Sequence, residues 1–545
     1  MENKKLDKHG IRFNVMAILL IAIFCFAISP ITLQNDTFYT IKIGEHILEN
    51  GIDMKDPFSF HDLNYTYPHW LYDVGIYLIY SIGGQVGIYI STVVLCMLLG
   101  ITMYLTNVKL TKNKLTSFVL TIGAMFLLKN YIAARAQLVT FILFVFTVYN
   151  IEMFLESKKK RYAIGLIIIP IIIANVHVAV FPFYFIIYLP YIGEYVMYLL
   201  SNYEYITKEK KLVRFNKKIN KLEDENEKTE IRNKIKQIEE RNRVLLERRK
   251  KIDKNAYKLK IVKNDNIKAL IIIMLICLLS GLFTPLGTTP YTYLIKTMQG
   301  NTTQNISEHL PLTLINDLNL MCVLILFLVI LIFTDTKIRL CDLFMLGGLI
   351  FLTFYSRRQQ SMFILMCVYI LNRLICSMFN KYAKDACRNI EKKLTEVLPM
   401  ITTITVILII SIINYKPKIK NQFINDEAYP VEASNYILNN LDINEIRLYN
   451  EYNYGSYLLF RGIPVFIDSR ADLYSPEFNK GVEVFNDFLD LSGVNNDSIE
   501  EKLDKYGITH LIMYKDAKLK TFIKQDEEKY KMIYEDDYFC IFERK

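Results

Sequence analysis

Long runs of apolar residues alternate with short polar segments along most of this chain. About 18 or more consecutive apolar residues are typical of a helix that crosses a lipid bilayer. Runs near that length occur at residues 14–33, 84–107, 115–129, 136–154, 163–176, 178–200, 268–285, 317–334, 341–355, 360–379 and 397–414. We therefore predict a mainly α-helical, polytopic membrane protein with about 11 transmembrane helices. A hydrophobic fraction of 52% agrees and argues against an ordinary soluble enzyme.

Residues 201–268 interrupt this pattern with a highly charged block. The block holds 22 Lys/Arg and 12 Asp/Glu. Heptad-like spacing of apolar residues predicts a helical hairpin that turns near residues 224–226; these residues are Ile231, Ile235, Ile238, Leu245 and Ile252. Two interpretations stay open: a solvated insertion against anionic lipid headgroups, or a coiled coil that binds a cytoplasmic partner. The many acidic residues argue against nucleic-acid binding.

The last segment, residues 415–545, alternates short strand and helix patterns. Strands are predicted at 446–450, 464–468, 510–514, 530–536 and 538–543, and helices at 430–440, 477–490 and 498–507. This order predicts a small α/β domain. Asp468, Arg470 and Asp472 follow the second strand, where α/β proteins place ligand sites. An Arg–Asp pair that pins this loop is the alternative.

The charges of the connecting segments orient the chain. The segments at 1–12, 109–114, 156–162, 201–268, 335–340 and 380–393 carry net positive charge, and the loops between them hold few lysines. The positive-inside rule then places the N-terminus in the cytoplasm and residues 415–545 outside. The predicted division is 1–200 with helices 1–6 and a folded external loop 34–83, the hairpin 201–268, 269–414 with helices 7–11, and the external domain 415–545.

This orientation gathers ionisable residues at the outer membrane boundary. They are Asp36, Asp56, His61, His69, Arg135, His177, Glu308, Arg357 and Arg358. Such groups at the ends of apolar spans tend to cluster around a pathway or a site. The turn at 354–361 presents two arginines, which suit two-point phosphate binding. The alternative is snorkelling to lipid phosphates.

The first external loop begins with an amphipathic segment. Phe38, Tyr39, Ile41, Ile43, Ile47 and Leu48 predict a helix that lies in the membrane interface, with Gly51 as its cap. Asp36 stands at its start, where it is either a functional carboxylate or an N-cap.

The order of short motifs resembles bacterial polytopic proteins of the GT-C glycosyltransferase superfamily, which includes protein mannosyltransferases and oligosaccharyltransferases. After Asp36, the resemblance lies in "DPFSF" (56–60), "HWLYD" (69–73), "GGQVG" (83–87), "ARAQ" (134–137), "NVHVA" (175–179), "FTPLG" (283–287), "ISEHLP" (306–311), "YSRRQ" (355–359), "YNYGSYLL" (452–459) and "FIDSRADLY" (466–474). It covers nearly the full chain outside 201–268. Ala136, Thr284 and His309 depart from the family pattern.

The resemblance implies a reaction at the outer face of the bacterial cytoplasmic membrane. A polyprenyl-phosphate sugar is the donor, and the acceptor is a cell-surface glycan, lipid or protein. By this resemblance Asp36 is the catalytic carboxylate, a role that suits a general base. Phosphate binding falls to Arg357, Arg358 and Arg135, and His69, His177, Glu308 and Asp56 contribute to substrate binding.

No cofactor is required by the sequence. A divalent cation stays open, with Asp36, Asp56 and Glu308 as its ligands. The alternative function is a non-catalytic transporter or assembly scaffold for lipid-linked glycans. Transporters tend to show internal repeats and polar sites at the membrane midplane. This sequence shows neither, which favours the enzyme.

Overall fold

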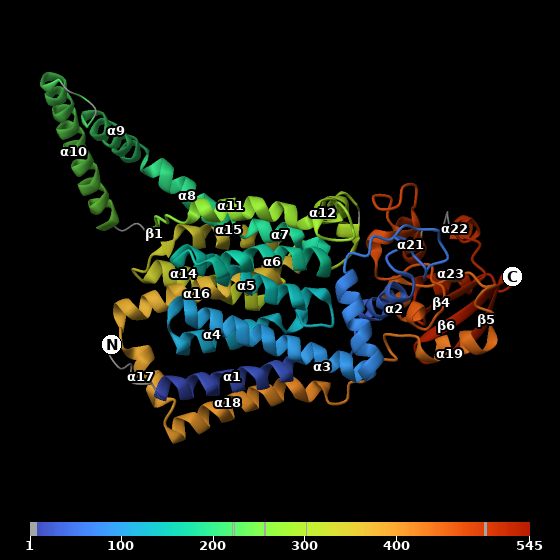
Figure 1. Cartoon of the computed structure of the whole chain (residues 1–545). Coiled ribbons are helices and arrows are strands. Elements are labelled where there is room, and N and C mark those ends of the chain that lie inside the picture. Colours follow the sequence, from blue (N-terminus) through green and yellow to red (C-terminus); the bar gives the residue numbers. More distant parts are fainter. Residues whose placement is uncertain (1–7, 221, 223, 255–257, 301, 495–498) are drawn as a thin grey trace.

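The computed structural model describes residues 8–220, 222, 224–254, 258–300, 302–494 and 499–545. Roughly parallel helices form a bundle, with a small α/β domain at one end and a helical hairpin at the other (Figure 1). The bundle helices are α1 (Lys8–Ile28), α3 (Trp70–Thr111), α4 (Lys114–Leu128), α5 (Ala136–Ser157), α6 (Lys160–Val176), α7 (Phe181–Ile186), α8 (Leu189–Ser201), α11 (Ile267–Cys277), α14 (Leu318–Phe333), α15 (Leu340–Tyr355), α16 (Gln360–Tyr382) and α18 (Val397–Tyr415).

Every apolar run identified in the sequence is mostly helical, although the runs 14–33 and 268–285 extend beyond the ends of their helices at Ile28 and Leu282. Among the described residues, six helical stretches are long and apolar enough to cross a membrane: Lys8–Ile28, Trp70–Thr111, Ala136–Ser157, Val178–Ser201, Arg357–Tyr382 and Val397–Lys418. Shorter apolar helices lie at Ile267–Leu282, Leu318–Phe333 and Leu340–Tyr355. The chain is therefore a polytopic, mainly helical membrane protein, and the number of 11 crossings stays a prediction.

The first external loop forms the helix α2 (Asn35–Asn50), which begins after Gln34 and is capped by Gly51 at φ +80°. Gly44 allows α2 to press against α3, because a Cβ there would lie 2.1 Å from the Asp73 carbonyl oxygen. On the other side, Phe38 packs against Tyr429 and Tyr457 of the C-terminal domain. The predicted interfacial helix is thus buried between two parts of the protein. Its apolar periodicity fits a protein surface as well as a lipid surface.

The helix α3 changes direction at Gly84, whose φ of +56° and ψ of −147° are non-helical. This backbone conformation is costly for residues with a Cβ. The kink separates a first segment that packs on α2 from a second segment that runs through the bundle (Figure 1). The first segment thereby supports α2, which forms one wall of the cavity described below.

The charged block forms the predicted pair of helices, α9 (Tyr203–Ile219) and α10 (Glu225–Lys254). The turn comes slightly earlier than the predicted residues 224–226, because α10 already begins at Glu225. Ile231 and Ile235 of α10 are buried in this pair. The returning chain forms β1 (Leu259–Lys260), which pairs in parallel with β2 (Ile338–Arg339). The N–H of Val262 donates to Glu194 of α8, and Arg339 pairs with the same carboxylate at 2.7 Å. These contacts anchor the base of the hairpin.

Shorter helices complete the fold. They are α12 (Thr289–Gln299), α13 (Thr302–Asn305), α17 (Ala386–Lys393) and, in the C-terminal domain, α19 (Val431–Asn440), α20 (Tyr452–Phe460), α21 (Val484–Gly493), α22 (Ile499–Lys505) and α23 (Lys518–Ile523). The 3-10 segments are Lys129–Tyr131, Val178–Val180, Leu278–Leu282, Leu314–Asn316, Arg357–Gln359, Lys416–Lys418 and Ala471–Tyr474.

The C-terminal domain is built on a four-stranded sheet with the order β3-β4-β6-β5. Its strands are β3 (Leu448–Tyr449), β4 (His510–Tyr514), β5 (Tyr530–Glu535) and β6 (Phe539–Arg544). The β3–β4 pair is parallel, and the two pairs made by β6 are antiparallel, with Ile512 opposite Ile541. The predicted helix 477–490 begins only at Val484, after Gly481 with φ +81°. Ser498, at the start of the predicted helix 498–507, lies outside the described residues.

The strand predicted at 464–468 is wrong. Val465 makes a single β-bridge to Ser59 of the first external loop. The Asn450 side chain accepts from the N–H of Phe466 and donates to the carbonyl of Ile467, at 2.8 and 2.7 Å. The buried side-chain amide of Asn450 therefore makes the backbone hydrogen bonds that a neighbouring β-strand would otherwise make. Apolar alternation could not distinguish these two ways of satisfying a buried backbone.

The same segment joins the first external loop to the C-terminal domain. Arg470 is buried and pairs with Asp468 at 2.6 Å and with Asp56 at 2.8 Å. His61 contacts the Phe466 carbonyl through its Nε2 at 2.9 Å. Burial would raise the pKa of Asp56, but the Arg470 guanidinium and the hydrogen bonds of Ser59 hold that pKa below its usual value. The Arg–Asp pairing interpretation of this loop therefore fits the observed geometry.

Candidate functional site

A cavity of about 1040 Å³ lies between the helix bundle and the C-terminal domain. Its walls come from α2, the segment 64–69, the start of α5, α7, α12, the loop 306–311, the end of α15 and the segments 452–453 and 469–473. Asp36, Arg135, His69, His177, Glu308 and Arg358 all line it. Residues that are far apart in the sequence thus meet at the end of the bundle that faces the C-terminal domain.

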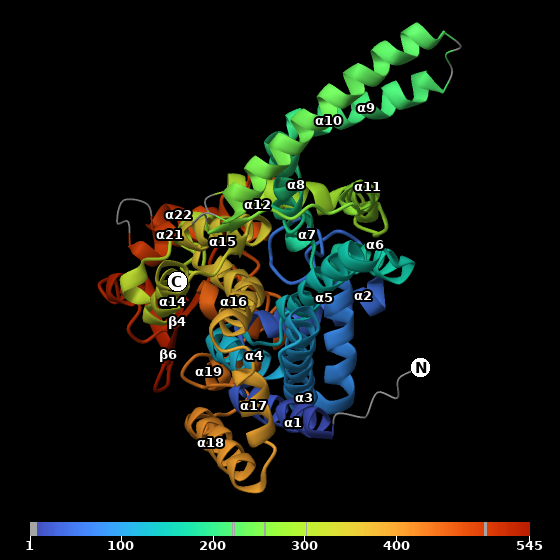
Figure 2. The ribbon, with the colours of Figure 1, turned by 90° about the vertical axis from the view of Figure 1, so that its left-hand side faces the viewer.

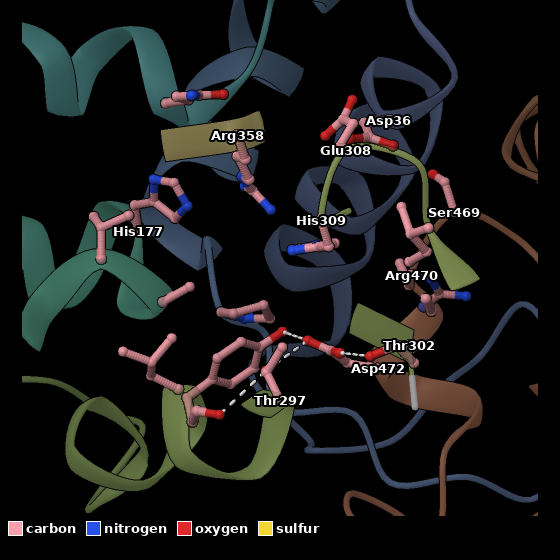
Figure 3. Close-up of a pocket in the computed structure, with 18 of the residues that line it drawn as sticks. Asp36, His177, Thr297, Thr302, Glu308, His309, Arg358, Ser469, Arg470 and Asp472 are labelled. Carbon is pink, nitrogen blue, oxygen red and sulfur yellow. Dashed lines mark hydrogen bonds between the residues drawn. The ribbon is translucent and has the colours of Figure 1, made fainter. Parts of the chain in front are cut away.

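Asp36 lies in the first turn of α2, and its carboxylate bonds to the Arg135 guanidinium at 2.9 Å. A carboxylate in the first turn also interacts favourably with the helix dipole. The N-cap alternative for Asp36 is wrong, because the cap position is Gln34 and its side chain makes no capping bond. The side chain of Asp36 is directed into the cavity beside Glu308 (Figure 3).

Arg135 immediately precedes α5 and is held by two carboxylates. Besides Asp36, its guanidinium lies 3.6 Å from the Glu308 carboxylate. The sequence hypothesis gave Arg135 a place in a phosphate clamp. Its observed contacts instead suit a residue that fixes the direction of the Asp36 carboxylate.

Arg358 belongs to the arginine turn between α15 and α16 and lines the cavity. Its guanidinium makes no hydrogen bond or ion pair with any described residue, in contrast to Arg135 and to Arg470, the other two guanidinium groups in the wall. Arg357 is exposed, does not line the cavity, and donates from Nε to the Pro311 carbonyl. The structure therefore separates the two arginines that the sequence treated as a pair.

Three histidines stand close to Arg358. The rings of His69 and His177 are 4.9 Å apart, and His177 Nδ1 lies 3.3 Å from the Thr140 hydroxyl. Burial and, to a smaller extent, the Arg358 charge lower the pKa of His69 and of His309 to about 4. Burial also lowers the pKa of His177 well below its ordinary value. At neutral pH these imidazoles are uncharged, so they add hydrogen-bonding groups to the cavity without adding charge.

A hydroxyl cluster forms the wall opposite Arg358 and His177 (Figure 3). The Asp472 carboxylate accepts from Tyr293 at 2.9 Å and from Thr297 at 3.0 Å, both on α12, and from Thr302 at 3.5 Å. Burial raises the pKa of Asp472 above its ordinary value, although the hydroxyl groups oppose this rise. The sequence singled out Asp472 but missed its partners, because isolated Tyr and Thr residues in a helix form no motif.

One side of the cavity is apolar. Val180, Phe183 and Ile186 of the segment before α8 contribute to it, as do Leu352, Phe354 and Tyr355 at the end of α15. Ile186 and Tyr355 are also among the exposed large apolar side chains. The cavity therefore combines a charged side with an apolar side.

The single tryptophan of the chain lies beside this cavity. Trp70 follows His69, and its indole N–H donates to the Asn175 side chain at 3.1 Å. Asn175 in turn donates to the Phe283 carbonyl at 2.9 Å, so one residue of the "NVHVA" motif holds two neighbouring segments together.

The proposed metal ligands do not form a site. Asp56 is buried in its ion pair with Arg470 and does not line the cavity, whereas Asp36 and Glu308 are both engaged with Arg135. No group of three His, Cys, Asp or Glu residues suited to a metal ion occurs among the described residues. Asp36, Asp56 and Glu308 therefore do not converge as the sequence suggested, and we derive no step through a metal.

The sequence matches no known protein family and no curated protein. Among solved structures, the chain is similar to an oligosaccharyltransferase of Archaeoglobus fulgidus determined in the apo form, with a TM-score of 0.53 and 13% sequence identity. The similarity covers 94% of this chain and 70% of the archaeal protein. The chain is therefore a polytopic membrane protein whose fold is similar to that of this archaeal oligosaccharyltransferase, and the motif order predicted a fold of this kind.

Proposed function

We propose that this protein is a membrane glycosyltransferase that transfers a sugar from a polyprenyl-phosphate donor to an acceptor outside the cell. One observation carries this proposal: Arg358, whose guanidinium pairs with no residue that the structure describes, and the oriented Asp36 carboxylate line one cavity. The similarity of the fold to an oligosaccharyltransferase supports glycosyl transfer. The acceptor is a cell-surface glycan, lipid or protein of the bacterial envelope.

The chemistry needs a proton acceptor and a stabilised leaving group. The acceptor hydroxyl forms a new C–O bond at the anomeric carbon and gives its proton to the Asp36 carboxylate. The bond between that carbon and the phosphate oxygen breaks, and both bonding electrons go to the phosphate. Arg358 then stabilises the negative charge that develops on this oxygen. Arg135 keeps the Asp36 carboxylate in one orientation during the transfer.

The apolar side of the cavity supports a lipid-linked donor. A polyprenyl chain needs an apolar path from the reacting phosphate to the bilayer. The residues contributed by α7 and by the end of α15 supply such a wall, and two of them, Ile186 and Tyr355, are exposed apolar side chains. Neutral histidines near Arg358 fit the phosphate end of this path, since they offer ring nitrogens that are not committed to ion pairs.

The test compares Asp36→Asn and Arg358→Gln with a matched control, Arg357→Gln, in purified protein reconstituted in nanodiscs. Turnover and binding of a polyprenyl-phosphate sugar are measured for each. We expect Asp36→Asn to lower turnover by about 10²–10⁴-fold and to leave donor binding nearly unchanged. Arg358→Gln should weaken donor binding by about 1.5–3 kcal/mol, because it removes a charge-assisted contact. Arg357→Gln should resemble the wild type, because its side chain lies outside the cavity.

Two results would overturn the proposal. Wild-type protein that binds no polyprenyl-phosphate sugar would favour the non-catalytic scaffold. Wild-type binding without turnover in any member of a panel of acceptors, together with unchanged binding in Arg358→Gln, would show that the cavity serves another ligand.

A further inference from the structure

The outward side of α9 carries a row of basic residues, which we call the basic stripe: Lys210, Lys211, Arg214, Lys217 and Lys218. All five are exposed. Lys210, Arg214, Lys217 and Lys218 follow the spacing that places residues on one face of a helix, and Lys211 lies beside them. No acidic residue falls between positions 210 and 218. The stripe is therefore a surface of a single sign.

The two helices of the hairpin differ in how their charges are compensated. On α10, Arg232 and Lys234 pair with Glu225 and Glu230, and Arg241 reaches across to Glu204. By contrast, no member of the basic stripe forms an ion pair with a carboxylate in the part of the chain that the structure describes. On α10 such pairs alternate with basic residues that have none among the described residues, Lys236 and Arg243 for example, whereas on α9 the residues without a pair form one continuous face.

The direction of the stripe follows from packing. Leu212, Phe215 and Ile219 of α9 are half-buried and lie on the helix face opposite the stripe, where α10 packs. Figure 1 shows α9 on the side of the hairpin nearer to the bundle, with α10 on the far side. Viewed along the bundle in Figure 2, the hairpin extends sideways beyond the outline of the other helices. The stripe therefore faces the region that lipid would occupy around this end of the bundle.

The path of the chain into α9 has the order expected across a membrane boundary. Val196, Leu199 and Leu200 of α8 are exposed apolar residues. Tyr203 follows, with 71% of its surface exposed, and it stands seven residues before Lys210, on the same face as the stripe. Apolar side chains, an aromatic residue and then basic residues match the hydrocarbon, interfacial and headgroup layers of a bilayer.

We propose that the basic stripe of α9 binds the anionic headgroups of the adjacent lipid leaflet, so that the hairpin lies along the membrane surface. Each Lys or Arg near an anionic surface adds to the attraction, which decays within a Debye length. An acidic protein would match the charge equally well. The neighbouring exposed Tyr203 and Leu200 and the direction of the stripe favour the lipid surface.

The test uses the full chain in nanodiscs of phosphatidylcholine alone or mixed with about 30% phosphatidylglycerol. Amide hydrogen exchange is followed in residues 203–219. We expect exchange in the wild type to be slower by on the order of tenfold in the anionic discs, and high salt to remove the difference. Replacement of all five stripe residues by Gln should abolish the difference in exchange between the two kinds of disc. The matched control replaces five exposed basic residues of α10 by Gln and should retain it; these are Arg232, Lys234, Lys236, Arg241 and Arg243.

Equal exchange of the wild type in both kinds of disc would overturn the proposal and leave an acidic protein partner as the explanation of the stripe. Equal loss of the lipid effect in the α10 control would also overturn it, because net charge alone would then account for the attraction. The circular dichroism of both variants, measured in phosphatidylcholine discs, establishes that the hairpin is still helical.

Discussion

Three guanidinium groups reach the cavity, and their partners give them different chemistry. Arg470 is enclosed by two buried carboxylates and has a structural role. Arg135 pairs with Asp36 and Glu308, and both of these carboxylates line the cavity. Arg358 has no such partner in the described chain and is available to an anionic ligand. At the scale of single residues, the local balance of charge therefore separates binding, orientation and folding.

This separation predicts that Arg135→Gln slows turnover without the loss of donor affinity expected for Arg358→Gln. A misdirected catalytic carboxylate can cost on the order of 10²-fold in rate. Arg135→Lys should recover part of this loss, because lysine keeps the charge but not the planar contact. Kinetics of the double variant Arg135→Gln/Asp36→Asn provide the control: it should be no slower than Asp36→Asn alone. A large fall in donor affinity for Arg135→Gln would return Arg135 to the phosphate clamp.

At the scale of elements, the first external loop and the C-terminal domain form one unit around Arg470. The loop contributes Asp56 and α2, and the domain contributes Asp468 and the aromatic side chains that enclose Phe38. The helix α2 is thus packed between α3 and the C-terminal domain. A change in the contact around Arg470 would therefore alter the position of Asp36 on this helix.

Charge counting predicts unequal effects when this contact is broken. Asp56→Asn leaves Arg470 paired with Asp468, so we expect a loss of about 1–3 kcal/mol in stability. Arg470→Met leaves two buried carboxylates without a cation and should cost about 3–5 kcal/mol. Thermal unfolding in detergent, followed by fluorescence-detected size exclusion, measures both. Equal destabilisation by the two variants would contradict the idea that Arg470 serves both carboxylates.

The sequence predicted the helices better than it predicted which residues contact one another in the folded chain. Apolar periodicity located the helical segments because both lipid and protein bury apolar surface. It also made α2 an interfacial helix, because the domain that covers Phe38 is about 400 residues distant in the sequence. The order of the motifs predicted a shared site, and one cavity is indeed lined by Asp36, Arg135, Glu308 and Arg358. The motif order did not separate Arg357 from Arg358, because the direction of adjacent side chains in a turn depends on tertiary contacts.

At the scale of the whole molecule, the hairpin and the N-terminal end of α1 lie at the end of the bundle opposite the C-terminal domain and the cavity (Figure 1). This arrangement agrees with the charge pattern, which assigns the hairpin and the N-terminus to the cytoplasm and the C-terminal domain to the outside. The cellular side of each end stays a prediction. A reporter inserted after residue 230 should be cytoplasmic, and one after residue 430 should be external.

The distance between the hairpin and the cavity predicts that residues 208–254 can be replaced by a short Gly/Ser linker with little loss of turnover. Residues 258–262 must be kept, because β1 pairs with β2 and Val262 bonds to Glu194. A longer deletion of 208–262 should therefore lower the yield of folded protein. Turnover assays on the two deletions, normalised to folded protein, distinguish these roles. Background activity in the shorter deletion, with normal folding, would show that the hairpin is required for the reaction.

The hydrogen bond from Trp70 to Asn175 gives the molecule a built-in optical reporter. The chain contains one indole, and it stands next to His69 at the edge of the cavity. Ultraviolet emission at long wavelength therefore comes from a single place, without dye, label or background from other tryptophans. A ligand that enters the cavity should alter the polarity around this ring, so unmodified protein can be titrated by its own fluorescence.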